Sequence, residues 1–336
     1  MGPRRLTRPG RERYGPAVLT QRWVSTATAD DAEQVRALAV AVAAADGVDA
    51  YAEPARRDLA ALGIGGGRPS TRHLLVHDGD ELVGPALLDR EHPDDPVAEL
   101  AVHPGHRRRG VGAQLVDAVL EAAPGARFWA HGDHPGAARL AARIGWRRAR
   151  ELWRMRRPAP GDGAERGSTP SGAPEATPLP ALAVPDGVVI RPLRVGRDED
   201  AVVAVNNRAV AWHPEQSGWT RADVEEIEAE AWFDAEGVLL AWDTATSELL
   251  GFHFTKVHAV AAGVPEPLGE VYVVGVDPGA QGRGLGRALT LAGLHHLADR
   301  GLRVTILYVE GDNAAAIATY RRLGFERDAV DVSYQR

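Results

Sequence analysis

The chain has 336 residues, of which 44% are hydrophobic and 25% charged, and its formal net charge is −7. This length predicts about two domains, and the negative charge argues against a general nucleic-acid-binding protein, which needs an electropositive surface. The lack of cysteine excludes structural disulfides, thiolate metal sites and a cysteine nucleophile, and no apolar run is long enough to span a membrane, so we expect a cytoplasmic protein.

The first 22 residues carry six arginines and one glutamate among several glycines and prolines. This composition predicts a disordered basic tail over residues 1–22, and the segment lacks the apolar core of a secretory signal. A first strand is expected at Trp23–Ser25, and the periodic run Ala37–Ala45 predicts an amphipathic helix.

A glycine loop follows a strand pattern in the first half. The run Glu99–Pro104 predicts a strand, Arg107–Gly112 (RRRGVG) a tight loop, and Ala113–Ala122 an amphipathic helix. In a strand–loop–helix unit, the N–H groups of the loop and the positive end of the helix point at one spot, which suits a pyrophosphate. The half closes with a predicted capped helix, Gly132–Arg143, and a strand that opens at Trp146.

The second half repeats this order. Its first strand is predicted at Val188–Arg191 and a later strand at Val271–Val276. The loop Gln281–Gly286 (QGRGLG) lies 174 residues after the first loop. Helices are predicted at Arg287–Arg300 and Asn313–Arg322, and Phe325 opens the last strand.

The matched order indicates a tandem repeat of one fold. We expect an N-terminal domain over residues 23–157, a linker rich in proline and glycine over residues 158–186, and a C-terminal domain over residues 187–336. Neither loop has the third glycine of a dinucleotide fingerprint or the Gly-Lys-Ser/Thr of a Walker loop. The spacing Arg/Gln-x-x-Gly-x-Gly instead resembles the acyl-coenzyme A loop of the GCN5-related N-acetyltransferase (GNAT) family.

The resemblance implies an α/β fold with a mixed α+β sheet in each of two tandem domains, and acetyl-coenzyme A as co-substrate. The residues that it places at the coenzyme are Leu100, Ala101, Val102, Arg108, Arg109, Gly110, Val111, Gly112, Ala113, Val274, Gly275, Val276, Gln281, Gly282, Arg283, Gly284, Leu285, Gly286, Arg287, Asn313, Ala314, Ala315, Ala316, Ile317 and Ala318. The N–H groups around Gly275 are candidates to bind the thioester oxygen, because a glycine there is compatible with a bulge that splays the strand.

Aligning the two halves separates their chemistry. Tyr320 falls opposite Ala141, and Glu270 falls opposite Pro96 when residues are counted back from the proline of each copy. In the family this tyrosine commonly protonates the departing thiolate, which costs about 2 kcal/mol for ordinary pKa values of about 10 and about 8.5. Glu270 is the candidate general base toward the amine, directly or through water. We therefore expect Glu270 and Tyr320 to be catalytic and the N-terminal domain to be catalytically degenerate.

Longer strings resemble the mycothiol synthase family, the tandem acetyltransferases that complete mycothiol biosynthesis. They are Ala45–Val48, Phe128–Gly132, Met155–Pro158, Val205–Asn207, His213–Thr220, Glu230–Asp234, Gly251–His258 and Gly269–Pro278. The resemblance implies acetyl transfer to the cysteinyl amine of a cysteinyl glucosaminyl-inositol conjugate. It also implies an acceptor site lined by Glu53, Glu215, Lys256, Glu270 and Tyr308.

Simpler interpretations stay open for several residues. Lys256 can be an exposed strand charge, Glu215 a cap, Glu270 a solvated charge at the start of a strand, and Tyr320 a core aromatic. The histidines, among them His131 and His258, lack a metal-binding spacing, so we expect no metal.

The functional alternatives are a tandem acetyltransferase for another small-molecule or protein amine, and a non-catalytic module that binds acetyl-coenzyme A. In each case we expect a small-molecule ligand, no nucleic-acid or membrane partner, and a monomer.

Overall fold

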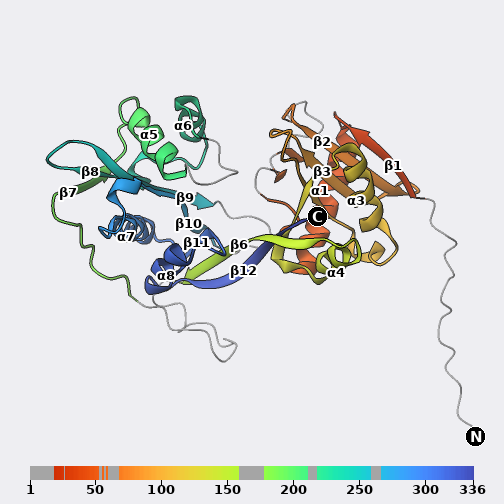
Figure 1. The fold of residues 1–336 in the computed structure, drawn as a ribbon. Helices are drawn as coiled ribbons and strands as arrows, with labels where there is room; N and C mark the ends of the chain where they lie inside the picture. Colours follow the sequence, from red (N-terminus) through yellow and green to blue (C-terminus); the bar gives the residue numbers. More distant parts are fainter. Residues whose placement is uncertain are drawn as a thin grey trace, which may run out of the picture. The chain divides into compact units, whose positions relative to one another are not determined.

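The computed structural model describes residues 19–25, 27–52, 55–56, 58–59, 68–158, 178–210, 218–258 and 266–336. They belong to two compact units. Unit 1 comprises the chain up to Glu151 together with Asp331–Arg336, and unit 2 comprises Leu152–Val330. Most strands and helices of each unit are labelled in Figure 1. Within the described residues, no helix combines the length and the apolar character that crossing a membrane requires.

Unit 1 is a mixed sheet with the strand order β1-β2-β3-β4-β5-β12. The pairing is antiparallel except between β4 and β5, which run parallel. Its strands are β1 (Leu19–Val24), β2 (Thr71–Asp78), β3 (Glu81–Asp89), β4 (Val97–Leu100), β5 (Arg127–Ala130) and the end of β12 (Glu326–Gln335). Its helices are α1 (Ala29–Asp46), α3 (Val111–Ala122) and α4 (Pro135–Arg143), with short 3-10 turns η1 (Pro104–His106) and η2 (His131–Asp133).

Helices cover both faces of the central strands of unit 1. Leu74 and Val76 of β2 pack in one core with α3, whereas Leu75, between them, packs in a second core with α1. Alternate residues of a strand point to opposite faces, so both faces must be apolar. This explains why β2 and β3 read as nearly continuous apolar runs.

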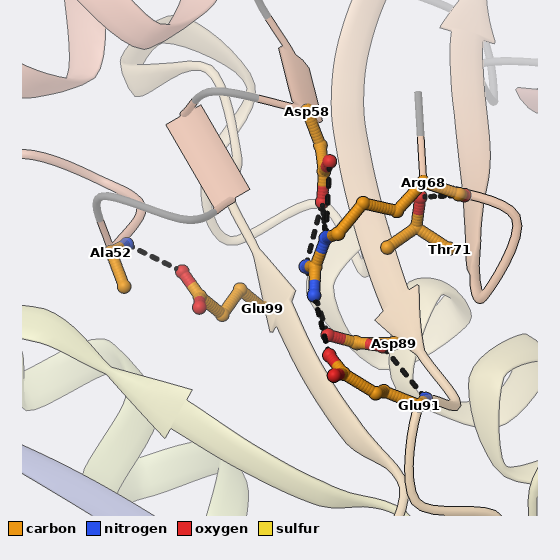
Figure 2. Close-up of polar contacts among 7 residues, drawn as sticks. All are labelled: Ala52, Asp58, Arg68, Thr71, Asp89, Glu91 and Glu99. Atoms are coloured by element: carbon orange, nitrogen blue, oxygen red, sulfur yellow. Dashed lines mark hydrogen bonds and ion pairs between the residues drawn. The ribbon is translucent and has the colours of Figure 1, made fainter. Parts of the chain in front are cut away.

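An arginine holds the segment before β2 against unit 1. Arg68 contacts Asp58 at 2.7 Å, Asp89 at 2.9 Å and Glu91 at 2.8 Å, as Figure 2 shows. The hydrogen bonds that Arg68 donates to Asp58 raise the pKa of Arg68 above its ordinary range. Arg68 Nε donates to Asp58 Oδ1 and Nη2 to Oδ2, and this bidentate geometry fixes direction as well as distance.

Unit 2 repeats the plan with the strand order β6-β11-β10-β9-β8-β7. Its strands are β6 (Arg147–Pro158, from Leu152 onward), β7 (Val188–Pro192), β8 (Val238–Asp243), β9 (Leu249–His258), β10 (Leu268–Val276) and β11 (Val304–Glu310). Its helices are α5 (Glu199–Val210), α6 (Arg221–Glu228), α7 (Leu285–Asp299) and α8 (Ala314–Arg322), with 3-10 turns η3 (Ala235–Gly237) and η4 (Pro278–Ala280). One face of the sheet packs against α5 and α6, and the other against α7 and α8.

The predicted domain boundaries miss an exchange of final strands. From Leu152 onward β6 pairs with β11, for example Met155 with Leu307, and so belongs to unit 2. Residues 332–334 of β12 pair with β5 in unit 1. A strand pattern in the sequence shows that a strand forms but not which neighbour it pairs with. Each final strand was therefore predicted to belong to the same domain as the helix that precedes it.

The tail and linker boundaries also need correction. Residues 19–22, assigned to a disordered tail, form most of β1, and the rest of the predicted tail lies outside the described residues. Residues 178–186 of the predicted linker are described and form no helix or strand. They are held to unit 2 because Leu179 packs in its core and His295 Nε2 lies 2.9 Å from the carbonyl oxygen of Pro180.

Candidate active site

The two glycine loops have the same backbone shape. In unit 2, Gly282 and Gly284 have positive φ angles of 77° and 83°. In unit 1, Arg108 and Gly110 occupy the matching positions with φ angles of 66° and 94°. A positive φ strains a residue that carries a Cβ atom, so the loop of unit 1 keeps its shape even where an arginine replaces a glycine.

Each loop leads into a helix whose start lacks a side-chain cap. Gly110 is the N-cap of α3 and Gly284 the N-cap of α7, and neither helix start has a side-chain cap hydrogen bond. The first N–H groups of a helix need partners, and an uncapped start favours an anion. This geometry is the one predicted for a pyrophosphate, and it is present in both units.

Strands β10 and β11 separate where the predicted thioester would lie. They are paired over Gly269–Val271 and Thr305–Leu307, although β10 continues to Val276 and β11 to Glu310, all within the described part of the chain. A bulge between Val271 and Val273 shifts the register of β10 against β9. The splay of the strand therefore begins at this bulge and not at Gly275.

Gly275 has a packing role instead. A Cβ atom there would lie 2.5 Å from the Phe252 ring, so any larger residue would force this buried ring to move. The N–H of Asp277 donates to the carbonyl of Leu250 in β9, and alternate residues bond to the same neighbouring strand, so the N–H of Gly275 also belongs to the β9 ladder. The N–H groups of Val274 and Val276 point to the other side and remain candidates for the thioester oxygen.

Glu270 is buried in a charged cluster of unit 2 and is not a solvated strand charge. Its side chain is 6% exposed, and its Oε2 lies 2.5 Å from His258 Nε2. In the register of β9 and β10, Glu270 is the partner of Lys256. Residues that face each other in an antiparallel pair lie on the same side of the sheet, so both point toward the α5 and α6 face.

Lys256 is also buried, which excludes an exposed strand charge. It is 3% exposed, and its Nζ lies 4.8 Å from the Trp232 ring centre and 4.9 Å from that of Tyr272. Cation–π contacts of this length hold an ammonium in an apolar setting. The sequence interpretation gave no role to His258, Trp232 or Tyr272, although His258 is two residues from Lys256 on the same strand face.

Tyr308 lies on the same face as Glu270. It is 43% exposed on β11, two residues after Ile306, which pairs with Glu270. Tyr308 is the cross-strand partner of Arg154 on β6 and contacts it. Burial lowers the pKa of Arg154, but the charge of Asp328 and the hydrogen bonds that Arg154 donates to Asp328 and Tyr308 raise it above its ordinary value. The structure therefore brings three predicted acceptor-site residues, Lys256, Glu270 and Tyr308, onto one face of unit 2.

Tyr320 lies on the opposite face, on α8. Its ring packs against Phe325 at 6.0 Å in the core beneath α7 and α8. Burial raises the pKa of Tyr320 to about 12, so the hydroxyl keeps its proton at neutral pH. The ring of Tyr320 therefore packs against the core, as the simpler interpretation expected, and only its hydroxyl is left for catalysis.

The repeat alignment of Tyr320 with Ala141 is confirmed by the helix starts. His134 is the N-cap of α4 and Asn313 the N-cap of α8, and both helices have nine residues. Ala141 and Tyr320 each lie seven residues after the cap. Asn313 uses its Oδ1 to accept the N–H of Ala316 at 3.1 Å, so a coenzyme contact would fall to its amide NH₂ and to the helix start formed by Ala314, Ala315, Ala316, Ile317 and Ala318.

Two predicted acceptor residues, Glu53 and Glu215, lie outside the described residues. Their positions stay predictions.

Unit 1 has no carboxylate at the position of Glu270. The strand register places Val97 there, because Val97 pairs with Asp89 as Glu270 pairs with Lys256. The sequence count gave Pro96, one residue off, since it could not include the bulge in β10. The conclusion that only unit 2 holds both groups is unchanged.

The glutamate of β4, Glu99, is held in a structural network. Its Oε2 accepts the N–H of Ala52 at 2.7 Å, as Figure 2 shows, and lies 3.1 Å from His131 Nε2. The other ring nitrogen of His131 lies 3.0 Å from Asp331 Oδ2. Burial alone would lower the pKa of His131, but hydrogen bonds with Asp331 and Glu99 raise it to about 10.

This network predicts a pH-dependent stability of unit 1. The folded-state pKa of His131 lies above its ordinary value of 6.5, so its stabilisation is complete below pH 6.5 and disappears as the pH rises through about 10. We expect the free energy of unfolding to fall by on the order of 2 to 4 kcal/mol over this range relative to a His131→Gln variant. Urea unfolding of both proteins at several pH values measures this difference. If the free energy of unfolding depends on pH in the same way in both proteins, His131 does not have the raised pKa.

A cavity of about 750 Å³ lies in unit 1 beside its glycine loop. Among the predicted coenzyme residues, Leu100, Ala101, Val102, Arg108, Gly110, Gly112 and Ala113 line it. Arg107 also lines the cavity and forms a bidentate ion pair with Asp46 at 2.7 and 2.8 Å. The volume is within the range of small-molecule and cofactor sites, so the loop of unit 1 borders a space for a ligand.

Both halves match acetyltransferase family models. Residues 205–325 match the acetyltransferase (GNAT) family, and residues 69–148 match an acetyltransferase (GNAT) domain. The chain is 52% identical over 311 residues to the mycothiol acetyltransferase of Thermobispora bispora, covering 92% of this chain and 97% of the relative. It is 49% identical to the mycothiol acetyltransferase of Nocardia farcinica, covering 94% and 97%.

Solved structures share the fold. The chain matches a GCN5-related N-acetyltransferase from Sphaerobacter thermophilus with a TM-score of 0.72 and 23% identity, covering 95% of each chain. It matches a tandem GNAT protein from the clavulanic acid biosynthesis pathway with a TM-score of 0.67 and 21% identity, covering 94% and 98%. These similarities confirm the predicted α/β class and tandem repeat.

Proposed function

The chain belongs to the mycothiol acetyltransferases of the GNAT family, and we propose that it transfers acetyl from acetyl-coenzyme A to the cysteinyl amine of a cysteinyl glucosaminyl-inositol conjugate, the last step of mycothiol biosynthesis. The observation that carries the proposal is the gap between β10 and β11, with buried Glu270 on one face of the sheet and Tyr320 on the other. A thioester in this gap can be approached by an amine from one face while its sulfur is protonated from the other.

The residues of unit 2 divide the work. The loop Gln281–Gly286 and the start of α7 hold the pyrophosphate of acetyl-coenzyme A. The N–H groups of Val274 and Val276 bind the thioester oxygen as it gains negative charge. Glu270 accepts the proton of the attacking amine, and His258 at 2.5 Å holds its carboxylate in place and can pass the proton toward solvent.

The acceptor site lies on the Glu270 face. Lys256, held between Trp232 and Tyr272, and the half-exposed Tyr308 supply a positive charge and a hydroxyl toward a polyol substrate. Glu53 and Glu215 stay predicted acceptor residues, because both lie outside the described residues. A single chain carries every group that the reaction needs, so the proposal requires only a monomer.

Unit 1 binds acetyl-coenzyme A without turning it over. Its cavity and loop fit the coenzyme, but Val97 and Ala141 stand where unit 2 has the base and the acid.

The test is a direct search for product. Purified protein is incubated with acetyl-coenzyme A and the cysteinyl glucosaminyl-inositol conjugate, and mass spectrometry detects the N-acetylated product. A dye that reports thiol release is unsuitable, because the acceptor carries a thiol. No product at micromolar enzyme, or faster acetylation of an unrelated amine, would refute the proposed substrate.

The binding of the coenzyme by both units is tested separately. Equilibrium dialysis with acetyl-coenzyme A should give two sites per chain, whereas one site would limit binding to unit 2.

A further inference from the structure

Two histidines and a glutamate gather where the glycine loop of unit 1 begins. His103 caps the 3-10 turn η1 and His106 is its last residue, immediately before Arg107, whereas Glu81 starts β3. One ligand atom from each of the three residues lies within 4.8 Å of the others. The prediction of no metal did not consider His103 and His106, whose partner Glu81 is 22 residues away in the sequence.

The second copy of the repeat shows that the loop does not need histidines here. In unit 2 the corresponding residues are Asp277 and Ala280. Asp277 caps η4 by accepting the N–H of Gly279 at 2.8 Å, the same role that His103 Nδ1 has toward Gly105 at 3.2 Å. Ala280 is a buried apolar residue. Since aspartate is the usual cap and histidine is not, the two histidines call for a reason beyond the loop geometry.

The spacing of the cluster suits a tetrahedral metal ion. His106 Nε2 lies 3.2 Å from Glu81 Oε2, and two ligands that are each about 2.0 Å from a tetrahedral ion are about 3.3 Å apart. The other ring nitrogen of His106, Nδ1, is buried, has no hydrogen-bond partner among the described residues and lies 3.6 Å from Asp78 Oδ2. A carboxylate beside the second nitrogen is the arrangement that orients metal-bound histidines.

We propose that His103, His106 and Glu81 bind a zinc ion at the entrance of the unit 1 loop, with Asp78 orienting His106. Two imidazoles and one carboxylate are a known zinc ligand set that leaves a fourth position for water. The ring of His106 already has the orientation that metal binding needs, with Nε2 toward the metal position and Nδ1 toward Asp78.

His103 contributes less than His106, because binding disturbs its cap. If Nδ1 binds zinc, it gives up the N–H of Gly105; if Nε2 binds, Nδ1 must carry the proton and can no longer accept that N–H. The bound ion would join the hairpin between β2 and β3 to the turn η1. It would thereby restrain the loop Arg107–Gly112 beside the cavity.

The experiment is titration of the tag-free full chain with zinc chloride by calorimetry at pH 7.5, after removal of metals with a chelator. We expect one saturable site, at least tenfold weaker in His106→Ala and weaker by a smaller factor in His103→Ala and Glu81→Gln. His92→Ala, which removes an exposed histidine of unit 1 outside the cluster, is the matched control and should bind as the wild type does.

Two further measurements keep the result interpretable. Circular dichroism and melting temperature verify that each variant folds, and Glu81→Gln changes a side chain that is 56% exposed. Hydrogen exchange of the loop Arg107–Gly112 should slow on adding zinc to the wild type and not to His106→Ala. No saturable zinc binding by the wild type, or equal binding by His106→Ala, would overturn the proposal and leave His106 as the partner of two carboxylates only.

Discussion

Replacing Glu270 with glutamine is expected to slow acetyl transfer at neutral pH by about 10²- to 10⁴-fold while leaving the affinity for acetyl-coenzyme A nearly unchanged. Glutamine keeps the shape and the contact with His258 but cannot accept a proton from the attacking amine. The carboxylate is buried on the acceptor face, away from the pyrophosphate loop, so coenzyme binding should not depend on it.

The pH profile distinguishes a base from a structural residue. An α-amino group has an ordinary pKa of about 7.7 to 8.0, so above this range the amine reaches the enzyme already deprotonated. The ratio of wild-type to variant rate should therefore shrink as the pH rises from 7 to 9.5. A constant ratio would show that Glu270 does not serve in deprotonation, and unchanged turnover would remove it from the mechanism.

Glu99→Gln is the matched control for this experiment. Glu99 is also a buried strand glutamate in contact with a histidine, but it lies in unit 1. We expect this variant to lose stability through the weakened pair with His131, while its rate with acceptor stays near that of the wild type. Equal loss of rate in both variants would indicate a general effect of buried charge and not a reaction step.

Local features of the fold were predictable because local chemistry determines them. The predicted helices at Ala113–Ala122 and Asn313–Arg322 lie within one or two residues of α3 and α8, since their glycine or asparagine caps and periodic apolar residues lie within the segment itself. The same reason explains why the Ala141–Tyr320 comparison is right: both helices are counted from their own caps.

Non-local features were missed. The bulge at Tyr272 depends on how β10 pairs with β9, and it moved the counterpart of Glu270 from Pro96 to Val97. The exchange of β6 and β12 depends on competition between neighbouring strands, which alternation of side chains cannot resolve.

The burial and the contacts of the predicted acceptor residues also could not be predicted from the sequence pattern. Lys256 and Glu270 were named from a resemblance, but their burial against Trp232, Tyr272 and His258 comes from segments that fold together. His258 had an available signal, because it shares a strand face with Lys256. No sequence signal predicted the contact of Lys256 with Trp232, which lies on the segment after α6.

Replacing Tyr320 with phenylalanine is expected to reduce turnover by about 10²-fold or more, because the departing thiolate loses its proton donor. A tyrosine with a pKa of about 12 gives its proton to a thiolate with a pKa near 8.5 at a cost of about 5 kcal/mol. That cost is larger than the ordinary pKa values of the two groups suggested. It requires that proton transfer accompany C–S cleavage, when the sulfur is placed beside the hydroxyl by the coenzyme bound in the gap.

The phenylalanine ring keeps the contact with Phe325, so folding and coenzyme affinity should change little. Single-turnover mixing with chemical quench isolates the acetyl-transfer step from product release, and the loss should appear in that step. Tyr51→Phe is the matched control: it removes a buried tyrosine hydroxyl, which donates to the carbonyl of Pro85 in unit 1, and should leave the step unchanged. If Tyr320→Phe transfers acetyl as fast as Tyr51→Phe, the proton must reach the sulfur from solvent, and Tyr320 serves only the core beneath α7 and α8.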